Sequence, residues 1–137
     1  MKEQSNIPKI VTATNHSGTI VTNFMVRHHE FSCDEMPLYG GRDESPDPYD
    51  YLLSAVAGCT AITLRQFADE NEWDIGDINI RISYDRDQDG NDLFDKNISF
   101  TGTLSGDQKS KLLEAAYCNT EKLLKKGISF SNSIVDQ

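Results

Sequence analysis

The stretch Asp47-Pro-Tyr-Asp-Tyr-Leu-Leu-Ser-Ala-Val-Ala-Gly-Cys-Thr-Ala-Ile-Thr-Leu64 decides the fold of this chain. Asp47 is a typical helix N-cap and Pro48 suits the first helical position, so a helix is predicted to begin here. At about 100° per residue, the apolar side chains from Tyr49 onward surround the whole helix. A helix that is apolar around its circumference is expected to be buried on all sides. The stretch therefore predicts a central, buried helix.

Strand-forming residues precede this helix. Lys9–Thr14 and Thr19–Phe31 are rich in Val, Ile, Thr and Phe, and the turn residues Asn15–Gly18 lie between them, which predicts a hairpin. His29–Cys33 is expected to open a third strand. Met36–Asp47 contains glycines, prolines and a cluster of charges, so it is predicted to be a loop.

A second pair of strands is predicted after the central helix. Asp77–Tyr84 and Leu93–Leu104 alternate apolar and polar residues, and Asp89-Gly-Asn91 supplies a turn between them. Ser105-Gly-Asp-Gln108 is a capping box that opens another helix. The predicted core stripe of that helix consists of Leu112, Leu113, Ala116, Tyr117, Leu123 and Leu124.

Gly127 is expected to end this helix, and Ile128–Val135 to close the chain as a strand. The predicted order is β-β-(β)-α-β-β-α-β. Hairpin-paired strands with helices inserted between them indicate the α+β class with largely antiparallel sheets, here packed around a buried central helix.

Length and charge limit the possible functions. The 137 residues fit one domain, spanning residues 1–137, with a single core. A net charge of −9 argues against binding to nucleic acid or to an anionic membrane. Met1–Pro8 lacks the apolar segment of a signal peptide, and the 14-residue apolar run Tyr51–Leu64 is shorter than a bilayer span. We therefore expect a cytoplasmic protein with reduced thiols.

Two cysteines stand out by their positions. Cys59 lies in the middle of the apolar run, where a lone thiol is most often a small hydrophobic side chain. In an unbroken second helix, Cys118 would project opposite the core stripe. The alternative is a helix break at Cys118-Asn-Thr120, with the thiol facing free backbone N–H groups, which favour a thiolate. Either geometry is expected to leave Cys118 more accessible than Cys59.

These segments together resemble the OsmC/Ohr family. Gly40–Arg65, followed by Trp73, is similar to the central-helix signature of that family. The upstream segments Arg27–His29 and Asp34–Pro37 resemble the region before this loop. Downstream, the capping box and Leu112–Cys118 match the helix that carries the second cysteine of the family. The resemblance covers nearly the whole chain.

The resemblance implies an intertwined homodimer with two active sites near the subunit interface. It also implies a thiol peroxidase that reduces organic hydroperoxides in defence against oxidative and osmotic stress. By position, Cys59 would be the peroxidatic thiolate and Cys118 the resolving thiol. Their disulfide would be reduced by an external dithiol, without a cofactor. A small apolar hydroperoxide is expected beside Tyr49, Asp50, Leu52, Ala55 and Ile62.

Such a mechanism needs a cation beside Cys59, because an apolar environment alone keeps a thiol protonated. Arg42 in the glycine loop is the first candidate and Arg27 on the preceding strand is the second; the alternative for each is a solvated surface charge. In the hydroperoxide-resistance branch, a Pro-Glu pair stands where this chain has Pro48-Tyr49. Asp50 comes one residue later, rotated by about 100°, so it cannot simply replace that carboxylate.

Two other classes of function stay open. A metal site could combine Cys33, Cys59, Cys118 and one histidine, but no close ligand spacing supports it, and no metal is expected. A non-enzymatic protein could instead bind an apolar ligand at the dimer interface, with Cys59 only lining the pocket.

Overall fold

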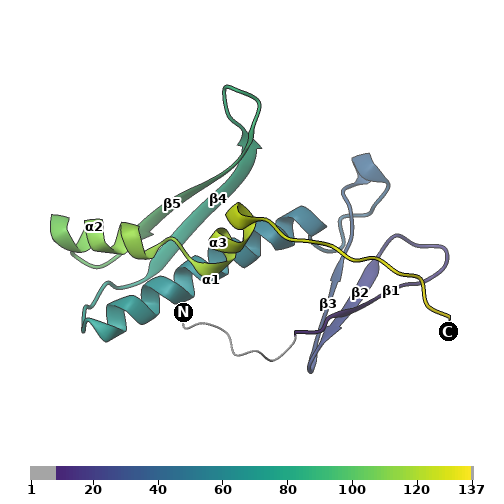
Figure 1. Cartoon of the computed structure of the whole chain (residues 1–137), viewed down its shortest axis with the longest axis horizontal. Coiled ribbons are helices and arrows are strands. Elements are labelled where there is room, and N and C mark those ends of the chain that lie inside the picture. The colour runs from purple at the N-terminus through teal and green to yellow at the C-terminus, as the bar shows by residue number, and fades with distance from the viewer. Residues whose placement is uncertain (1–8, 137) are drawn as a thin grey trace. The chain divides into compact units, whose positions relative to one another are not determined.

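The computed structural model describes residues 9–136 and has an α+β fold (Figure 1). Over these residues, three α-helices and five strands follow one another. The antiparallel sheets agree with the prediction, whereas the predicted order had two helices and a closing strand. The elements are β1 (Thr12–Asn15), β2 (Thr22–Val26), β3 (His29–Cys33), the 3₁₀ helix η1 (Pro37–Tyr39), α1 (Pro48–Glu70), β4 (Ile78–Arg86), β5 (Asp92–Phe100), α2 (Gly106–Ala115) and α3 (Asn119–Lys126).

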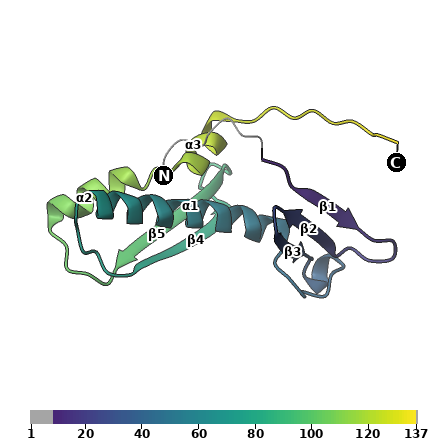
Figure 2. The same ribbon diagram turned by 90° about the horizontal axis from the view of Figure 1, so that it is seen from below.

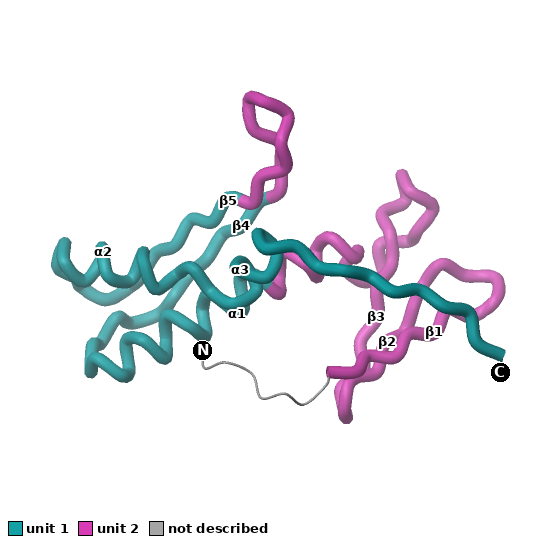
Figure 3. Tube along the Cα trace, viewed as in Figure 1, with its two compact units in different colours: residues 1, 56–83, 95–137 teal, residues 2–55, 84–94 magenta. Residues whose placement is uncertain are grey.

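The chain divides into two compact units (Figure 3). Of the described residues, unit 1 contains 56–83 and 95–136, and unit 2 contains 9–55 and 84–94. Helix α1 and the hairpin of β4 and β5 contribute residues to both units, whereas β1–β3 belong to unit 2 and α2 and α3 belong to unit 1. That the units form a single domain remains a prediction.

Unit 2 contains a three-stranded antiparallel sheet in the order β1-β2-β3. Phe24 and Phe31 face each other across β2 and β3, with ring centroids 5.0 Å apart, and the Phe31 ring lies 5.5 Å from that of Tyr51. The Tyr51 hydroxyl donates a hydrogen bond to the Ser32 carbonyl, which ties the first turn of α1 to β3. The predicted hairpin and third strand are confirmed, although a turn at Arg27 (φ 54°) separates β2 from β3.

Helix α1 begins at the predicted residue. The Asp50 N–H donates to Asp47 Oδ1 at 2.8 Å, and the Asp47 N–H donates to Asp50 Oδ2 at 3.0 Å. This reciprocal pair satisfies two backbone donors at the helix start.

Only one side of α1 is buried within the chain. The buried residues are Val56, Cys59, Thr60, Leu64 and Ala68. Ile62, on the same helix, is 50% exposed, and Tyr49 and Leu52 are also exposed. The prediction that the helix is buried on all sides is therefore wrong for a single chain, because its other elements cannot cover the full circumference.

The core of unit 1 lies between α1, α2 and the β4–β5 strands. Leu64 and Ala68 of α1 pack with Ile75, and with Leu112 and Ala116 from the α2 region. In two views at right angles, α2 runs beside the C-terminal half of α1 (Figure 1, Figure 2). On β4, Ile78, Ile80 and Ile82 occupy the less exposed positions of the alternating pattern, as predicted.

The second helical region is broken into two helices. The capping box of Ser105 and Gln108 is present and opens α2, and Gly127 follows the end of α3, both as predicted. Between Ala115 and Asn119 the chain leaves the helical path, so one continuous core stripe does not form. Leu112 is 1% exposed and Ala116 is buried, but Leu113 is 73% exposed, and Tyr117, Leu123 and Leu124 are also exposed.

The predicted closing strand is absent. Ile128–Val135 has no regular secondary structure and continues beyond α3 as extended chain (Figure 2). A strand requires a neighbouring strand to satisfy its backbone, and the two described sheets contain only β1–β3 and β4–β5. Among helices in the described part of the chain, none is long and apolar enough to cross a membrane. The segment Met1–Pro8, used to predict the absence of a signal peptide, lies outside the described residues.

Candidate active site

One face of α1 carries the first half of the candidate site. Val56, Cys59 and Thr60 are spaced i, i+3 and i+4, so their side chains lie on the same side of the helix. All three are buried, and the Thr60 hydroxyl donates to the Val56 carbonyl at 2.9 Å. The apolar α1 sequence thus places one thiol and one hydroxyl side by side in the interior of unit 1.

The break between α2 and α3 supplies the second half. Cys118 is the N-cap residue of α3, with extended backbone (φ −86°, ψ 171°). The alternative geometry predicted from Cys118-Asn-Thr120 is therefore confirmed, and the unbroken helix is wrong. The first N–H groups of α3, including that of Glu121, favour negative charge at the Cys118 sulfur.

The Cys118 sulfur lies among hydroxyl and carbonyl groups. Its Sγ is 3.4 Å from Thr60 Oγ1 and 3.4 Å from Thr120 Oγ1, and it donates as a thiol to the Val56 carbonyl at 3.9 Å. Cys118 is 2% exposed, against 6% for Cys59. The expectation that Cys118 is the more accessible thiol is wrong, because the helix break turns its side chain toward α1.

Two opposing effects act on the Cys118 thiol. Burial raises the pKa, but hydrogen bonds from Thr120, Thr60 and the Glu121 backbone, together with the Cys59 side chain, lower the pKa of Cys118 to about 7. The sulfur is therefore about half ionised near neutral pH. The contacts of Cys118 Sγ with Val56 and Thr60 place it against the segment of α1 that contains Cys59.

Lys96 is a functional candidate that the sequence reasoning missed. Its ammonium group donates to Thr60 Oγ1 at 3.0 Å and to the Ala116 carbonyl at 3.0 Å, and it forms an ion pair with Glu121 at 2.8 Å. The inward alternation of Ile98 and Phe100 along β5, continued backward, reaches Lys96. A lysine at an inward strand position was the signal that could have identified it.

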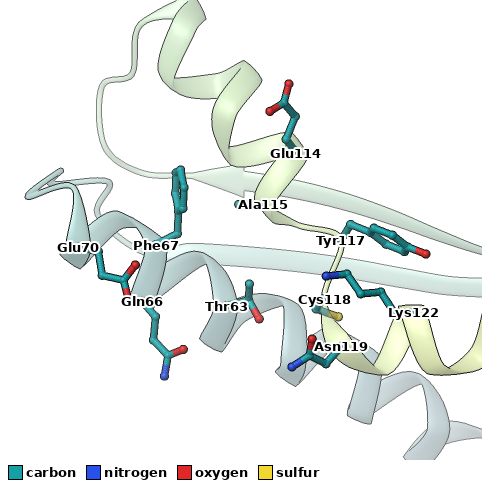
Figure 4. Close-up of a pocket in the computed structure, with 10 residues that line it drawn as sticks. All are labelled: Thr63, Gln66, Phe67, Glu70, Glu114, Ala115, Tyr117, Cys118, Asn119 and Lys122. Atoms are coloured by element: carbon teal, nitrogen blue, oxygen red, sulfur yellow. The ribbon is translucent and has the colours of Figure 1, made fainter. Parts of the chain in front are cut away.

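A cavity of about 420 Å³ reaches Cys118 from outside. Figure 4 shows that residues of α1 form one side and that residues around the α2–α3 break form the other. The lining residues are Thr63, Gln66, Phe67, Glu70, Glu114, Ala115, Tyr117, Cys118, Asn119 and Lys122. This lining is largely polar, in contrast to the apolar surroundings expected for the substrate, and it does not include Cys59.

Residues 9–136 contain no group of three His, Cys, Asp or Glu side chains that could hold a metal ion. Cys33, proposed above for such a site, belongs to unit 2, whereas Cys59 and Cys118 belong to unit 1. Burial, with the nearby carboxylates of Glu35 and Asp34, raises the pKa of Cys33. Its thiol is thus poorly suited to act as a nucleophile.

A family model described as OsmC-like protein matches residues 41–132, which include both cysteines of the candidate site. The chain belongs to the OsmC-like protein family.

Solved structures share the fold of this OsmC-like chain. A protein from Psychrobacter arcticus described as an osmotic stress induced and detoxification response protein is 20% identical, with 89% of this chain and 90% of that chain covered and a TM-score of 0.69. The OsmC like protein of Mycoplasma pneumoniae is 15% identical, with 88% and 89% covered and a TM-score of 0.69. The organic hydroperoxide resistance protein OhrB of Bacillus subtilis is 19% identical, with 86% and 90% covered and a TM-score of 0.56. A comparison with curated proteins gave no match.

The other predicted site residues of this OsmC-like chain are divided between the units. Ile62 belongs to unit 1, where it is exposed. Unit 2 contains the remaining ones, which are Arg27, Arg42, Tyr49, Asp50, Leu52 and Ala55. Tyr49, at the position where the hydroperoxide-resistance branch has a carboxylate, stacks on Tyr84 with ring centroids 5.8 Å apart. Asp50 is engaged in capping α1.

Arg42 lies in a loop that Asp34 organises. The buried Asp34 carboxylate accepts the backbone N–H groups of Glu35, Arg42 and Glu44 at 2.8, 3.2 and 3.1 Å. The bonds from Glu35 and Glu44 are the main cause that lowers the pKa of Asp34. Arg27, expected on a strand, instead occupies the turn after β2. Activation of Cys59 by either arginine stays a prediction.

Proposed function

We propose that this OsmC-like protein is a thiol peroxidase that reduces small organic hydroperoxides through Cys59 and Cys118. The observation that carries the proposal is the packing of the buried Cys118 sulfur against the segment of α1 that contains Cys59, 3.4 Å from Thr60 Oγ1 and 3.9 Å from the Val56 carbonyl. Two structures with the same fold are described as organic hydroperoxide resistance proteins, which supports the choice of substrate class.

The proposed reaction has two steps at sulfur. The Cys59 thiolate attacks the terminal oxygen of the hydroperoxide, the O–O bond breaks, and the alkoxide leaves and takes up a proton to become an alcohol. Cys59 is then a sulfenic acid. The Cys118 thiolate attacks the Cys59 sulfur, the S–O bond breaks, and hydroxide leaves as the disulfide forms. An external dithiol supplies the two electrons that restore both thiols. A cytoplasmic location, in which thiols stay reduced, is part of the proposal.

Peroxide consumption by single variants tests the function. With cumene hydroperoxide and dithiothreitol, wild type is expected to consume peroxide, and Cys59→Ser is expected to lose this activity. Cys118→Ser should retain the first step and accumulate a Cys59 sulfenic acid. Cys33→Ser is the matched control, because Cys33 lies in unit 2, and it should behave as wild type.

Peptide mapping under non-reducing conditions gives a second, direct test. One equivalent of peroxide should convert Cys59 and Cys118 into an intramolecular disulfide and leave Cys33 free. Unchanged peroxide consumption in Cys59→Ser would contradict the proposed function. Binding of cumene hydroperoxide without turnover would instead favour the non-enzymatic binding protein. Arg42→Ala and Arg27→Ala, assayed in parallel, identify the arginine whose loss slows the first step.

We also propose that the protein is a homodimer. Ile62 on α1 and the apolar residues Ile128, Phe130, Ile134 and Val135 beyond α3 are exposed within one chain. Burial of such side chains stabilises by roughly 25 cal/mol per Å² of apolar surface, so a second copy of the chain would gain by covering them. Light scattering should report twice the mass of 15.4 kDa. A chain that ends at Gly127 should dissociate more readily, and a wild-type monomer at micromolar concentration would contradict the proposal.

A further inference from the structure

Lys96 has a setting that is uncommon for lysine. It alternates with Phe94, Ile98 and Phe100 on the less exposed side of β5, and its side chain is only 12% exposed. Lysine is rarely buried unless it is paired. All three of its N–H donors have acceptors, namely Glu121, Thr60 and the Ala116 carbonyl. The position of the ammonium group is therefore fixed, close to the end of α2 and the start of α3.

The bond from Lys96 to Thr60 leads directly to a sulfur. The Thr60 hydroxyl carries one hydrogen and has two possible acceptors for it, the Val56 carbonyl at 2.9 Å and Cys118 Sγ at 3.4 Å. When Cys118 is neutral, the Thr60 hydroxyl donates this hydrogen to the Val56 carbonyl. With an ionised Cys118, rotation of the hydroxyl can direct the hydrogen to the sulfur, while Lys96 continues to donate to the hydroxyl oxygen.

We infer that Lys96 is a positioning residue that, through Thr60, holds the Cys118 sulfur as a thiolate ready for disulfide formation. A fixed cation behind the hydroxyl strengthens the donor that the hydroxyl presents to the sulfur, because chains of hydrogen bonds polarise one another. The positive charge also favours a nearby anion directly. The Thr60 hydroxyl, to which Lys96 donates, is one of the groups that lower the pKa of Cys118.

Several other charged or titratable groups surround Cys118. Glu121 of α3 pairs with Lys96 and opposes its effect, and the Cys59 side chain of α1 contributes to the lowered pKa of Cys118. The cavity side is lined by Glu70 of α1, Glu114 of α2, Tyr117 of the connecting segment, and Lys122 of α3. Lys96 is the cation that is both buried and linked to the sulfur through a hydroxyl.

The role of Lys96 in the reaction rests on the proposed peroxidase function. In the second step the Cys118 thiolate forms the S–S bond with Cys59 as the S–O bond of the sulfenic acid breaks, and hydroxide leaves and takes up a proton. Lys96 donates no proton in this step. It keeps the attacking sulfur ionised, so its loss should slow disulfide formation more at pH 7 than at pH 9.

A titration of Cys118 tests the inference without any peroxide. The background is Cys33→Ser/Cys59→Ser, in which the thiolate absorbance reports Cys118 and the serine at 59 keeps a hydroxyl beside it. Lys96→Met is expected to raise the pKa of Cys118 by about one unit or more. From a pKa of about 7, the ionised fraction at pH 7 would fall from about one half to about one tenth.

Glu121→Gln is the decisive partner variant. It removes the same ion pair as Lys96→Met, but it deletes the negative charge and leaves the positive one. We expect it to lower the pKa of Cys118, opposite to the effect of Lys96→Met. If Lys96 served only to fasten β5 to α3, both variants would loosen the structure and shift the pKa in the same direction or not at all. Either of those results overturns the inference.

Lys96→Arg retains the positive charge, so the pKa of Cys118 in this variant should stay closer to the wild-type value than in Lys96→Met. If Lys96→Met does not fold, as judged by circular dichroism, the direction in which Glu121→Gln shifts the pKa of Cys118 still tests the inference. The two proposals can fail separately. Opposite shifts together with an absence of peroxide reduction would refute the peroxidase alone, whereas peroxide reduction with pKa values that do not respond to Lys96 would refute this inference alone.

Discussion

Replacement of Thr60 by valine should raise the pKa of Cys118 strongly. Thr60 is fully buried, and its hydroxyl lies between Lys96 and the Cys118 sulfur. Valine has nearly the same shape, so the main changes are the loss of the hydrogen bond to the thiolate and the loss of an acceptor for Lys96. A hydrogen bond to a charged group contributes about 1.5–3 kcal/mol, and one pKa unit corresponds to about 1.4 kcal/mol. We expect a shift of about one to two units upward from a value of about 7.

The assay is a pH titration of the thiolate absorbance in the Cys33→Ser/Cys59→Ser background. Thr63→Val is the matched control, because Thr63 lies one turn further along α1 and its hydroxyl lacks a hydrogen-bond partner among the described residues. The same chemical change at Thr63 should leave the pKa of Cys118 near its starting value. Thr60→Ser, which keeps a hydroxyl, should shift the pKa less than Thr60→Val.

Equal titration curves for Thr60→Val and its parent would refute this reasoning, because they would mean that the hydroxyl does not stabilise the thiolate. Equal upward shifts in Thr60→Val and Thr63→Val would point instead to a general change in the packing of α1. The rate of disulfide formation with peroxide should depend on the ionised fraction of Cys118, so that Thr60→Val forms the disulfide more slowly than wild type at pH 7 and recovers toward pH 9.

Three further outcomes are expected. Leu112→Ala should lower the free energy of unfolding by about 2–5 kcal/mol in a urea melt, since the side chain is buried in unit 1, whereas Leu113→Ala on the exposed side should stay within about 0.5 kcal/mol of wild type. The pKa of Cys118 is lowered on folding from 9.0 to about 7, so the ionised thiol contributes stability that is fully present above pH 9 and is lost as the pH falls through 7. In reducing buffer, the free energy of unfolding of wild type should therefore rise relative to that of Cys118→Ala as the pH is raised from 7 to 9. Gly41→Ala should destabilise the loop before α1, measured by thermal denaturation, because the added carbon would overlap the backbone of Glu35.

Local features of the fold could be predicted because their causes are local in the chain. The Asp47–Pro48 helix start, the capping box at Ser105 and the final Gly127 each involve backbone groups a few residues away. The third strand, His29–Cys33, was also expected from the sequence and is present. The predicted closing strand failed for the opposite reason, since strand formation depends on a partner that the residue pattern does not identify.

The candidate site shows the same division between local and long-range causes. The sequence by itself determined that Cys59 lies on a helix of apolar character, and it allowed a helix break that would place Cys118 at a helix N-terminus. Only the tertiary structure decided between the broken and the unbroken helix, and brought Lys96 of β5 to Thr60. The physical reason is that the ionisation of a thiol depends on charges and donors within a few ångströms, and these come from segments far apart in the chain.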